Sequence, residues 1–537
     1  GVDVGTGSAR AGVFDGGGRL LAASAHPVQL FRPQPDFVEQ SSRDIWRSVC
    51  LAVRECVAAA GVAPARVAGI SFDATCSLVA LDADDRPVSV ALDGDPERNV
   101  VVWMDHRAEA EAAAINRTGH PVLRYVGGAL SPEQQPPKLK WIKDHLPDAW
   151  RRTRRFFDLS DYLVYEACGE DVRSLCTVVC KWTYLGHEGE HGRWDPSFFE
   201  QIGLADLFSP NRAGERVRPM GTRAGTLTPR AAAALGLADT TVVGVGMIDA
   251  HAGGVGSLGM RRAGELAGAD AFEHTLALVG GTSSCHMATA REARYVPGVW
   301  GPYYGAMLPG LWLTEGGQSA TGALLDLTIE SHPFAARLHQ HALASGVSVY
   351  DLLNDTVAAL RAAEGPDAPT ADLHVLPDHH GNRSPRADAS ARGMVSGLAL
   401  DASFESLARI YLATIQGIAY GTRHILEALG ERGYAITRIH ASGGGTKNAL
   451  WLQEHADVTG RDVYVARDSE SVLLGAAILA AVAAGHVAGI PEAIAAMSPA
   501  ADVVAPDAAR APFHERKYRV FHAMYADQQA YRRTMAG

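Results

Sequence analysis

One acidic residue lies where an apolar segment gives way to small side chains. The apolar segment covers residues 242–248, and Asp249 and a run of small residues around His251 follow it directly. A strand that ends in a carboxylate and continues into residues without bulk can place a reactive group at the edge of a cleft, because small residues allow a backbone or a substrate to come close. A strand followed by an Asp-capped helix explains the same pattern. The segment alone favours the helix cap, so the rest of the chain must decide.

Two turns rich in glycine and hydroxyl groups could bind phosphate. Each follows an apolar strand and precedes a second extended segment, and the backbone N–H groups and hydroxyls of such a corner can surround an anion. No helix follows the first turn, so neither a Rossmann nor a P-loop arrangement fits. A simple hairpin turn is the alternative interpretation. The residues are Gly5, Thr6, Gly7 and Ser8, followed by Arg10, at the first turn and Gly281, Thr282 and Ser283 at the second.

Further polar groups follow expected strands. The strands predicted at residues 67–72 and 100–104 lead into Cys76 and Asp105. Polar side chains at the ends of strands line ligand clefts in α/β sheets, although a loop acid or a helix cap accounts for each one singly. Lys181 stands among apolar neighbours, which is unusual for a residue that is normally solvated. Glu315 is followed by two glycines and precedes a predicted helix.

The elements that must position these residues repeat along the chain. The strand, turn and strand at residues 274–288 resemble those at residues 2–14, which predicts an internal duplication. Amphipathic helices are expected at residues 42–60 and 404–429, a buried Ala/Gly-rich helix at 471–484, and a final helix at 518–535. Two similar α/β domains would form a cleft with a phosphate-binding turn on each side and Asp249 near the boundary. Phosphoryl transfer is the chemistry that such a cleft supports.

Composition limits the other classes of protein. A chain of 537 residues with a net charge of −11 and 47% hydrophobic residues is long enough for two domains and has no global attraction for nucleic acid or an anionic membrane. No membrane-spanning segment is expected. Seven cysteines, an odd number, favour a reduced, cytoplasmic protein. Cys176 and Cys180 could share one helix face, but no CxxC or Cys/His finger accompanies them, so zinc is not expected.

Five spaced segments resemble those of the FGGY carbohydrate kinases, which have a duplicated actin-like (ribonuclease-H-like) ATPase fold. They are residues 3–10, 245–256, 280–284, 441–448 and 397–416, the last with Gln416 where many members carry an acid. Details at residues 103–108, 249–252, 281–286, 315–319 and 381–385 are most similar to the pentulose kinases, above all the D-ribulokinase group. The resemblance implies an N-terminal sugar-binding and phosphate-loop domain at residues 1–258 and a C-terminal nucleotide-binding domain at 259–537.

The resemblance also implies a reaction and residue roles. The expected activity is transfer of the ATP γ-phosphoryl group to the terminal hydroxyl of a ketopentose, D-ribulose above others, by a protein that is commonly a homodimer in this family. Asp249 is expected to be the general base, and Asp3 and Asp249 to hold Mg²⁺. The sugar is expected to contact Cys76, Asp105, Lys181, Asp249 and Glu315. The phosphates are expected at the two turns and Arg10, and adenosine at Gly444, Gly445 and Asn448.

Two alternatives stay open. The substrate could be L-ribulose, D-xylulose, a deoxy-pentulose or a polyol, because these motifs define phosphoryl chemistry better than sugar stereochemistry. A non-catalytic actin-like ATP-binding protein is the alternative from another class. The polar groups at Asp249, Lys181 and Glu315 argue against the second alternative.

Overall fold

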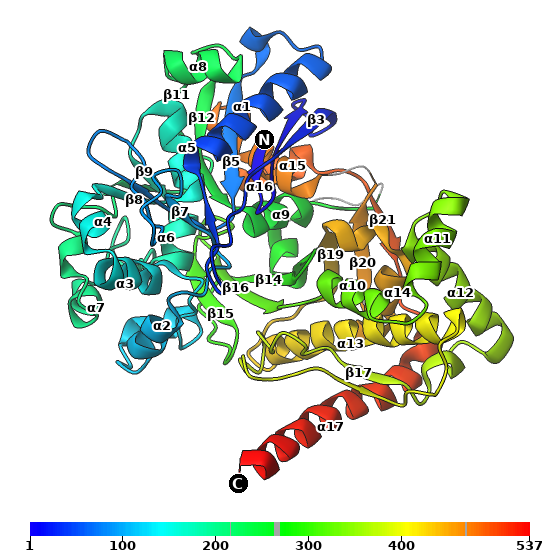
Figure 1. Cartoon of the computed structure of the whole chain (residues 1–537). Helices are drawn as coiled ribbons and strands as arrows, with labels where there is room; N and C mark the ends of the chain where they lie inside the picture. Colours follow the sequence, from blue (N-terminus) through cyan, green and yellow to red (C-terminus); the bar gives the residue numbers. More distant parts are fainter. Residues whose placement is uncertain (215, 263–268, 468–469, 537) are drawn as a thin grey trace.

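Two mixed β-sheets form the centre of the molecule (Figure 1). The computed structural model describes residues 1–214, 216–262, 269–467 and 470–536. The first sheet contains, in spatial order, β3 (Leu20–Pro27), β2 (Ser8–Phe14), β1 (Val2–Val4), β5 (Gly69–Ala74), β12 (Val242–Ile248) and β11 (Arg223–Thr226). The second contains β15 (Trp300–Tyr304), β16 (Trp312–Gln318), β14 (Ser284–Ala290), β13 (Thr275–Gly280), β19 (Arg438–Ser442), β20 (Asp462–Ala466) and β21 (Ala501–Val504).

The two sheets have the same topology. In the first, β3, β2 and β1 are antiparallel neighbours, β5 and β12 continue parallel to β1, and β11 ends the sheet antiparallel. In the second, β16, β14 and β13 are antiparallel, β19 and β20 are parallel to β13, and β21 is antiparallel. This correspondence, with β15 as an addition, confirms the predicted duplication.

Helices from each half cover the sheet of the other half. α1 (Ser42–Ala59) and α5 (Leu159–Cys168) pack on the first sheet together with α15 (Ser471–Ala483), which comes from the second half. α9 (Asp249–Leu258), which follows β12, packs against β13 and β19 of the second sheet. α9 and α15 also pack against each other between the two sheets, and most of their residues are buried.

Glycines allow α9 and α15 to touch backbone to backbone. A Cβ atom at Gly256 would lie 1.9 Å from the carbonyl oxygen of Ser471, and one at Gly475 would lie 2.0 Å from that of Ala252. No side chain fits at either position without a shift of the helices. The small residues after Asp249 therefore serve helix packing.

The first half carries an additional lobe, on the left in Figure 1. A four-stranded sheet with the order β4 (Glu39–Gln40), β7 (Val100–Val101), β6 (Leu78–Leu81) and β8 (Arg155–Asp158) lies in this part of the molecule. Its helices include α2 (Glu109–Asn116), α3 (Gln135–His145), α4 (Pro147–Arg152), α6 (Leu175–Lys181) and α7 (Pro196–Gln201). This lobe supplies Cys76, which follows β5, and Lys181, the last residue of α6.

The second half is built around one long helix. α13 (Phe404–Gly430) packs against α10 (Gly322–Glu330), α12 (Val349–Glu364) and α14 (Ala449–Thr459). Ser403 caps α13 by accepting a hydrogen bond from the Ser406 N–H. The apolar face of α13 is buried. Other elements of this half are α11 (Ala335–Ser345), α16 (Ile490–Met497), β17 (His374–Leu376) and β18 (Met394–Ser396).

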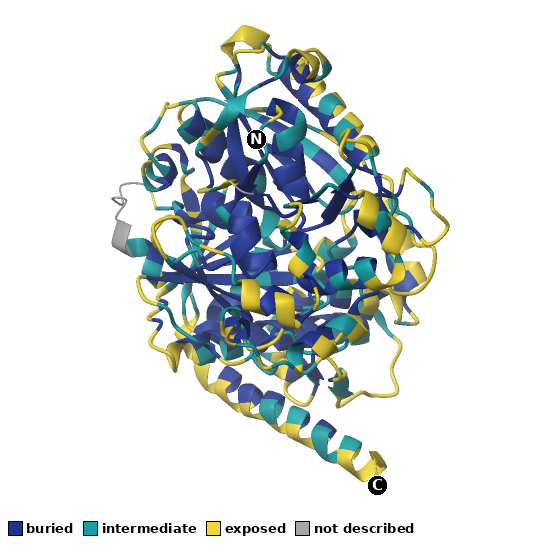
Figure 2. Ribbon diagram, turned by 90° about the vertical axis from the view of Figure 1, so that its left-hand side faces the viewer, coloured by how far each residue is buried: buried dark blue, intermediate teal, exposed yellow. Residues whose placement is uncertain are grey.

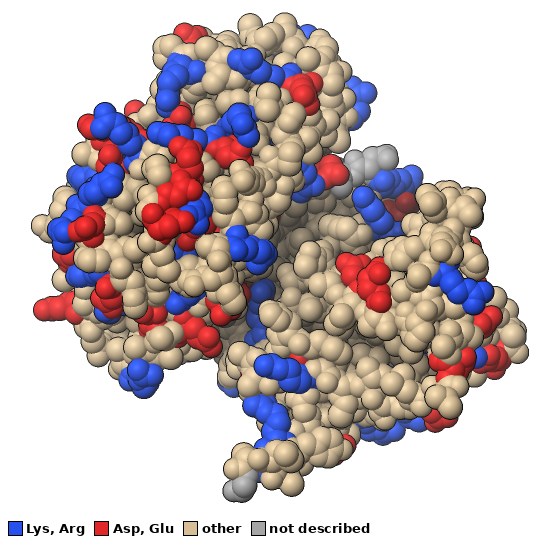
Figure 3. Space-filling view, in the orientation of Figure 1, with Lys and Arg blue, Asp and Glu red and all other residues tan. Residues whose placement is uncertain are grey.

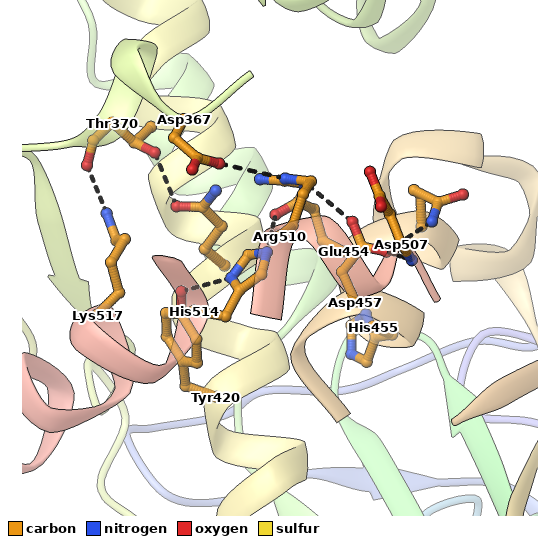
Figure 4. Close-up of polar contacts among 12 residues, drawn as sticks. Asp367, Thr370, Tyr420, Glu454, His455, Asp457, Asp507, Arg510, His514 and Lys517 are labelled. Carbon is orange, nitrogen blue, oxygen red and sulfur yellow. Dashed lines mark hydrogen bonds and ion pairs between the residues drawn. The ribbon is translucent and has the colours of Figure 1, made fainter. Parts of the chain in front are cut away.

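The last helix, α17 (Ala511–Ala536), is held from its first turn as far as Arg532, which pairs with Asp388, and its end projects from the body (Figures 1 and 2). Immediately before it, Arg510 donates to the buried carboxylates of Glu454 at 2.7 Å and Asp457 at 2.8 Å (Figure 4). Lys517 donates to the backbone oxygen of Thr370 at 2.6 Å. Charged hydrogen bonds thus attach the C-terminal helix to α14 and to the segment after α12.

Most predicted elements are present, with shifted ends. The helix predicted at residues 42–60 is α1, capped by Ser41. The final helix begins at Ala511 rather than at residue 518, because the first turn of a helix accepts Pro512 without losing a hydrogen bond. Residues 331–370 form two helices separated by Gly346, whose φ is +69°. Among the described residues, no helix has the length and apolar character needed to cross a membrane.

Candidate active site

Asp249 lies at the junction of β12 and α9, and its side chain is only partly buried. As the first residue of α9, it occupies a helix N-terminus, where a negative charge is favourable. Its Oδ1 accepts from the Ala250 N–H at 2.7 Å. Loss of solvation, and then the negative charge of Asp3, raise the pKa of Asp249 to about 6. A carboxylate with this pKa is ionised at neutral pH and is a stronger base than an ordinary aspartate.

Two more aspartates accompany it on neighbouring strands. Asp3 of β1 and Asp73 of β5 are register partners, and the Nε of Arg10 donates to Asp3 at 2.7 Å. Burial, followed by the charge of Asp3, raises the pKa of Asp73 well above its usual range, which favours its protonated form. The sequence analysis assigned no role to Asp73. Asp73 could have been identified from its place beside Asp3 in the sheet. That place is known only once β1 and β5 are paired.

Two of the three carboxyl groups, those of Asp3 and Asp249, offer oxygen ligands that suit a magnesium ion. Magnesium prefers oxygen ligands and keeps several of its water molecules. The ligand oxygens of Asp3, Asp73 and Asp249 do not all lie within 4.8 Å of one another. The raised pKa of Asp249 beside Asp3 reflects negative charge that a divalent cation would neutralise. Asp3 and Asp249 are therefore suitable residues to hold this cation through its water shell.

Three of the predicted sugar-binding residues lie close to Asp249. Cys76, Lys181 and Glu315 are almost entirely buried, with exposed fractions of 6%, 5% and 6%. Cys76 and Glu315 interact electrostatically with Lys181, and Lys181 interacts with Asp249. Burial opposes ionisation of Glu315, but the hydrogen bond from His251 and the charge of Lys181 lower its pKa to about 2. A buried cation and a buried anion thus interact close to the candidate base.

Asp105 does not join this group. It is fully buried, and Arg107 donates to both of its oxygens, at 2.8 Å from Nε to Oδ1 and 2.7 Å from Nη2 to Oδ2. The Val38 N–H also donates to Oδ2 at 2.6 Å. These contacts occupy the carboxylate, and Arg107 connects it to Glu39. The observed role of Asp105 is to order the segment after β7, and contact with a sugar stays a prediction.

An ion pair between Arg383 and Glu133 connects the two halves, and the sequence analysis did not predict it. Arg383 of the second half lies 3.6 Å from Glu133 of the first, and both side chains are largely buried. The Arg383 guanidinium lies 5.2 Å from the centre of the Trp300 ring, and Lys181 lies 4.9 Å from the same ring. The sequence analysis included Arg383 only as part of the segment 381–385. Both Arg383 and Lys181 contact the Trp300 ring, and both act electrostatically on Glu315.

The two glycine turns are equivalent and open. Gly5 donates to the Ser8 oxygen at 3.0 Å, and Gly281 donates to the Ser283 oxygen at 2.8 Å. A Cβ atom at Gly7 would meet nothing within 4 Å, and one at Gly281 would meet only the Ser283 oxygen at 3.7 Å. The space beside both turns is therefore available to a ligand, as a phosphate site requires.

The Thr6 hydroxyl already has a partner. Trp103 donates from Nε1 to Thr6 Oγ1 at 2.9 Å, and Gln40 donates to the Thr6 backbone oxygen at 2.8 Å. These contacts order the first turn from the additional lobe. Thr282 is exposed at the second turn, and Ser283 is partly buried.

Of the residues predicted to contact adenosine, the two glycines have space beside them, whereas the Asn448 side chain already forms hydrogen bonds within the protein. A Cβ atom at Gly444 would meet nothing within 4 Å, and one at Gly445 would make ordinary contacts with Trp451. Asn448 caps α14 by accepting from the Leu450 and Trp451 N–H groups, and it donates to the Tyr411 hydroxyl at 2.6 Å. Asn448 thus positions the glycine turn, and its contact with adenosine stays a prediction.

The space-filling view shows the molecule hollowed between the part with the first sheet and the part with the second (Figure 3). The N-terminal domain of the FGGY family of carbohydrate kinases matches residues 1–256, and the C-terminal domain of that family matches residues 276–484. The chain belongs to the FGGY family of carbohydrate kinases. This FGGY kinase thus contains both domains of the family, in the two-domain actin-like fold.

This FGGY kinase is similar to named proteins over most of its length. An FGGY carbohydrate kinase domain-containing protein from Danio rerio is 47% identical over 98% of the chain and 97% of its own length. A D-ribulokinase from Saccharomyces cerevisiae is 39% identical over 90% of the chain and 71% of its own length. A xylulose kinase from Rhodospirillum rubrum has the same fold, with a TM-score of 0.77 and 24% identity over 99% of both chains.

Proposed function

We propose that this FGGY kinase transfers the γ-phosphoryl group of ATP to the terminal hydroxyl of a ketopentose, with D-ribulose as the preferred substrate and D-ribulose 5-phosphate as the product. The observation that carries the proposal is the position of Asp249. It lies at a helix N-terminus, where it interacts electrostatically with Asp3, the partner of Arg10, and with buried Lys181, which in turn interacts with Glu315. The similarity to a yeast D-ribulokinase supports the choice of sugar.

In this mechanism, Asp249 accepts the proton of the sugar hydroxyl as that oxygen attacks the γ-phosphorus of ATP. Its raised pKa suits this task, since a base works best when its pKa is near the working pH. Lys181 and Glu315 offer a donor and an acceptor to the other hydroxyls of the sugar, with Cys76 as a neighbour, so they orient the acceptor.

The phosphates of ATP would lie between the two glycine turns. Gly5, Gly7 and Ser8 on one side and Gly281, Thr282 and Ser283 on the other supply N–H and hydroxyl donors, and Arg10 adds positive charge. Asp3 and Asp249 would hold Mg²⁺, which neutralises charge on the phosphates when it is bound. The adenosine would lie over Gly444 and Gly445, where the backbone leaves room.

A substrate screen tests this function. ADP release is measured by a coupled assay with D-ribulose, L-ribulose, D-xylulose and a set of polyols, and the phosphorylated product is identified by mass spectrometry and NMR. We expect the highest kcat/KM with D-ribulose. A higher value with another sugar would transfer the assignment to that sugar, and ATP hydrolysis that no sugar stimulates would refute the kinase.

A further inference from the structure

Among the residues that the structure describes, three potential metal ligands form one compact buried cluster beside the candidate active site. The cluster consists of the thiols of Cys176 and Cys180 and the imidazole of His251, and their ligand atoms all lie within 4.8 Å of one another. All three side chains are fully buried. The cysteines belong to α6, and His251 belongs to the first turn of α9. The function proposed above gives this cluster no task.

We propose that Cys176, Cys180 and His251 bind a zinc ion. Thiolate and imidazole are the ligands that zinc prefers, and the combination of two cysteines and one histidine leaves a fourth position for water. Ligand atoms around a tetrahedral zinc ion are about 3.5–3.8 Å apart, given bonds of about 2.0–2.3 Å. Cys176 Sγ and His251 Nδ1 are 3.2 Å apart, so zinc binding would move this pair apart by a few tenths of an ångström.

The imidazole is already oriented for this role. Its Nδ1 faces Cys176, and its Nε2 lies 3.3 Å from a carboxylate oxygen of Glu315. Zinc-bound histidines usually donate from the other ring nitrogen to a carboxylate, which fixes the ring and the tautomer. With zinc on Nδ1, Nε2 carries the proton and donates to Glu315. Binding would release two protons, one from Cys180 and one shared by Cys176 and His251.

Zinc at this position would connect the elements that hold the active site. Lys181 is the last residue of α6, and Asp249 is the first residue of α9. The ion would fix these two helices to each other and, through His251 and Glu315, to β16. Cys176 and Cys180 are four residues apart, but the third ligand comes from a distant segment. For this reason the sequence spacing argued against zinc.

Metal content of the intact chain tests the proposal. The protein is purified under reducing conditions and analysed by inductively coupled plasma mass spectrometry. The metal-free form is then titrated with Zn²⁺ against a chromophoric chelator, and with Co²⁺ for absorption. We expect about one zinc per chain and a thiolate-to-cobalt charge-transfer band. Cys176→Ser and Cys180→Ser should each lose this band, whereas Cys168→Ser, a buried thiol outside the cluster, should keep it.

Two further variants separate this site from its surroundings. Glu315→Gln should weaken zinc binding by about 10–100-fold while the cobalt band remains, because it changes only the partner of the ligand. Asp249→Asn should leave the zinc stoichiometry unchanged. If the serine variants do not fold, the metal-free wild type provides the test, since zinc should raise its melting temperature.

Either of two results would overturn the proposal: wild-type protein that binds no zinc and gives no cobalt–thiolate band, or serine variants that fold and retain zinc. These measurements do not depend on the sugar, so the proposal can fail while the kinase assignment stands.

Discussion

Replacement of Asp249 by asparagine is the most direct test of the proposed chemistry. The amide has nearly the same shape as the carboxylate but cannot accept a proton, so we expect kcat to fall by about 10²–10⁴-fold, the usual contribution of a general base. ATP binding should remain, because the glycine turns that would hold the phosphates belong to other segments. A coupled assay for ADP gives kcat, and isothermal calorimetry gives the affinity for ATP.

The pH profile gives the same test a second signature. Burial and Asp3 raise the pKa of Asp249 to about 6. The base is active when ionised, so wild-type kcat should be constant at higher pH and should fall as the pH decreases through about 6. The fall should approach tenfold per pH unit, because a single group is protonated. The residual activity of Asp249→Asn should lack this decrease.

Asp73→Asn is a matched control in the same group of carboxyls. Burial and the charge of Asp3 raise the pKa of Asp73 well above the usual range and favour its protonated form, which an amide resembles in shape and charge. We expect its kcat to stay within about tenfold of wild type, which corresponds to about 1.4 kcal/mol. The reasoning would be refuted if Asp249→Asn retained more than about a tenth of wild-type kcat, or if the acid limb persisted in that variant.

Three further outcomes follow from the packing and the charges. Lys181→Met should lower kcat/KM for the sugar by about 10–100-fold, since a charged hydrogen bond is lost, with little change in KM for ATP in steady-state kinetics. Gly475→Ala should reduce the free energy of unfolding by about 1–3 kcal/mol, because its Cβ would lie 2.0 Å from a backbone oxygen of α9. The control Gly430→Ala, with open space around it, should not destabilise the protein in thermal unfolding. Arg510→Met should reduce the free energy of unfolding by about 1.5–3 kcal/mol, because the buried carboxylates of Glu454 and Asp457 each lose a charged hydrogen bond while Arg361 still pairs with Glu454. Burial opposes ionisation of Glu454, but Arg510 and Arg361 together lower its pKa to about 2. The stability from these pairs is therefore present above pH 4.5, the ordinary pKa of the group, and is lost as the pH falls through about 2.

The repeat of the fold was readable from local patterns. The two strand–turn–strand segments contain the same glycine and hydroxyl signals, and these depend on backbone geometry that the residue types determine nearby in the chain. The strand before Asp249 was also predictable, because a run of apolar residues ended at a single acid. The correspondence of strand order in the two sheets confirmed this duplication.

Contacts between side chains that are distant in the sequence could not be predicted from local sequence patterns. Asp105 has the same local context as other strand-end acids, yet Arg107 occupies both of its oxygens. Asp73 became part of the carboxyl group only through strand pairing, and Arg383 met Glu133 only through the approach of the two halves. Such contacts depend on tertiary packing over long separations, which single-sequence patterns do not contain.

The glycine contact between α9 and α15 affects how the two halves can move. Where two helices meet backbone to backbone, no interlocked side chains must be pulled apart when one helix turns on the other, so a small rotation there disturbs few rotamers. Points near such a pivot move least, and points far from it sweep the longest arcs. Asp249 begins the helix that contains Gly256, whereas Gly444 lies on a separate turn after β19. A rotation of the two halves about this contact would therefore move the turn at Gly444 further than Asp249. The predicted nucleotide site would approach the candidate base, while the base itself would move little.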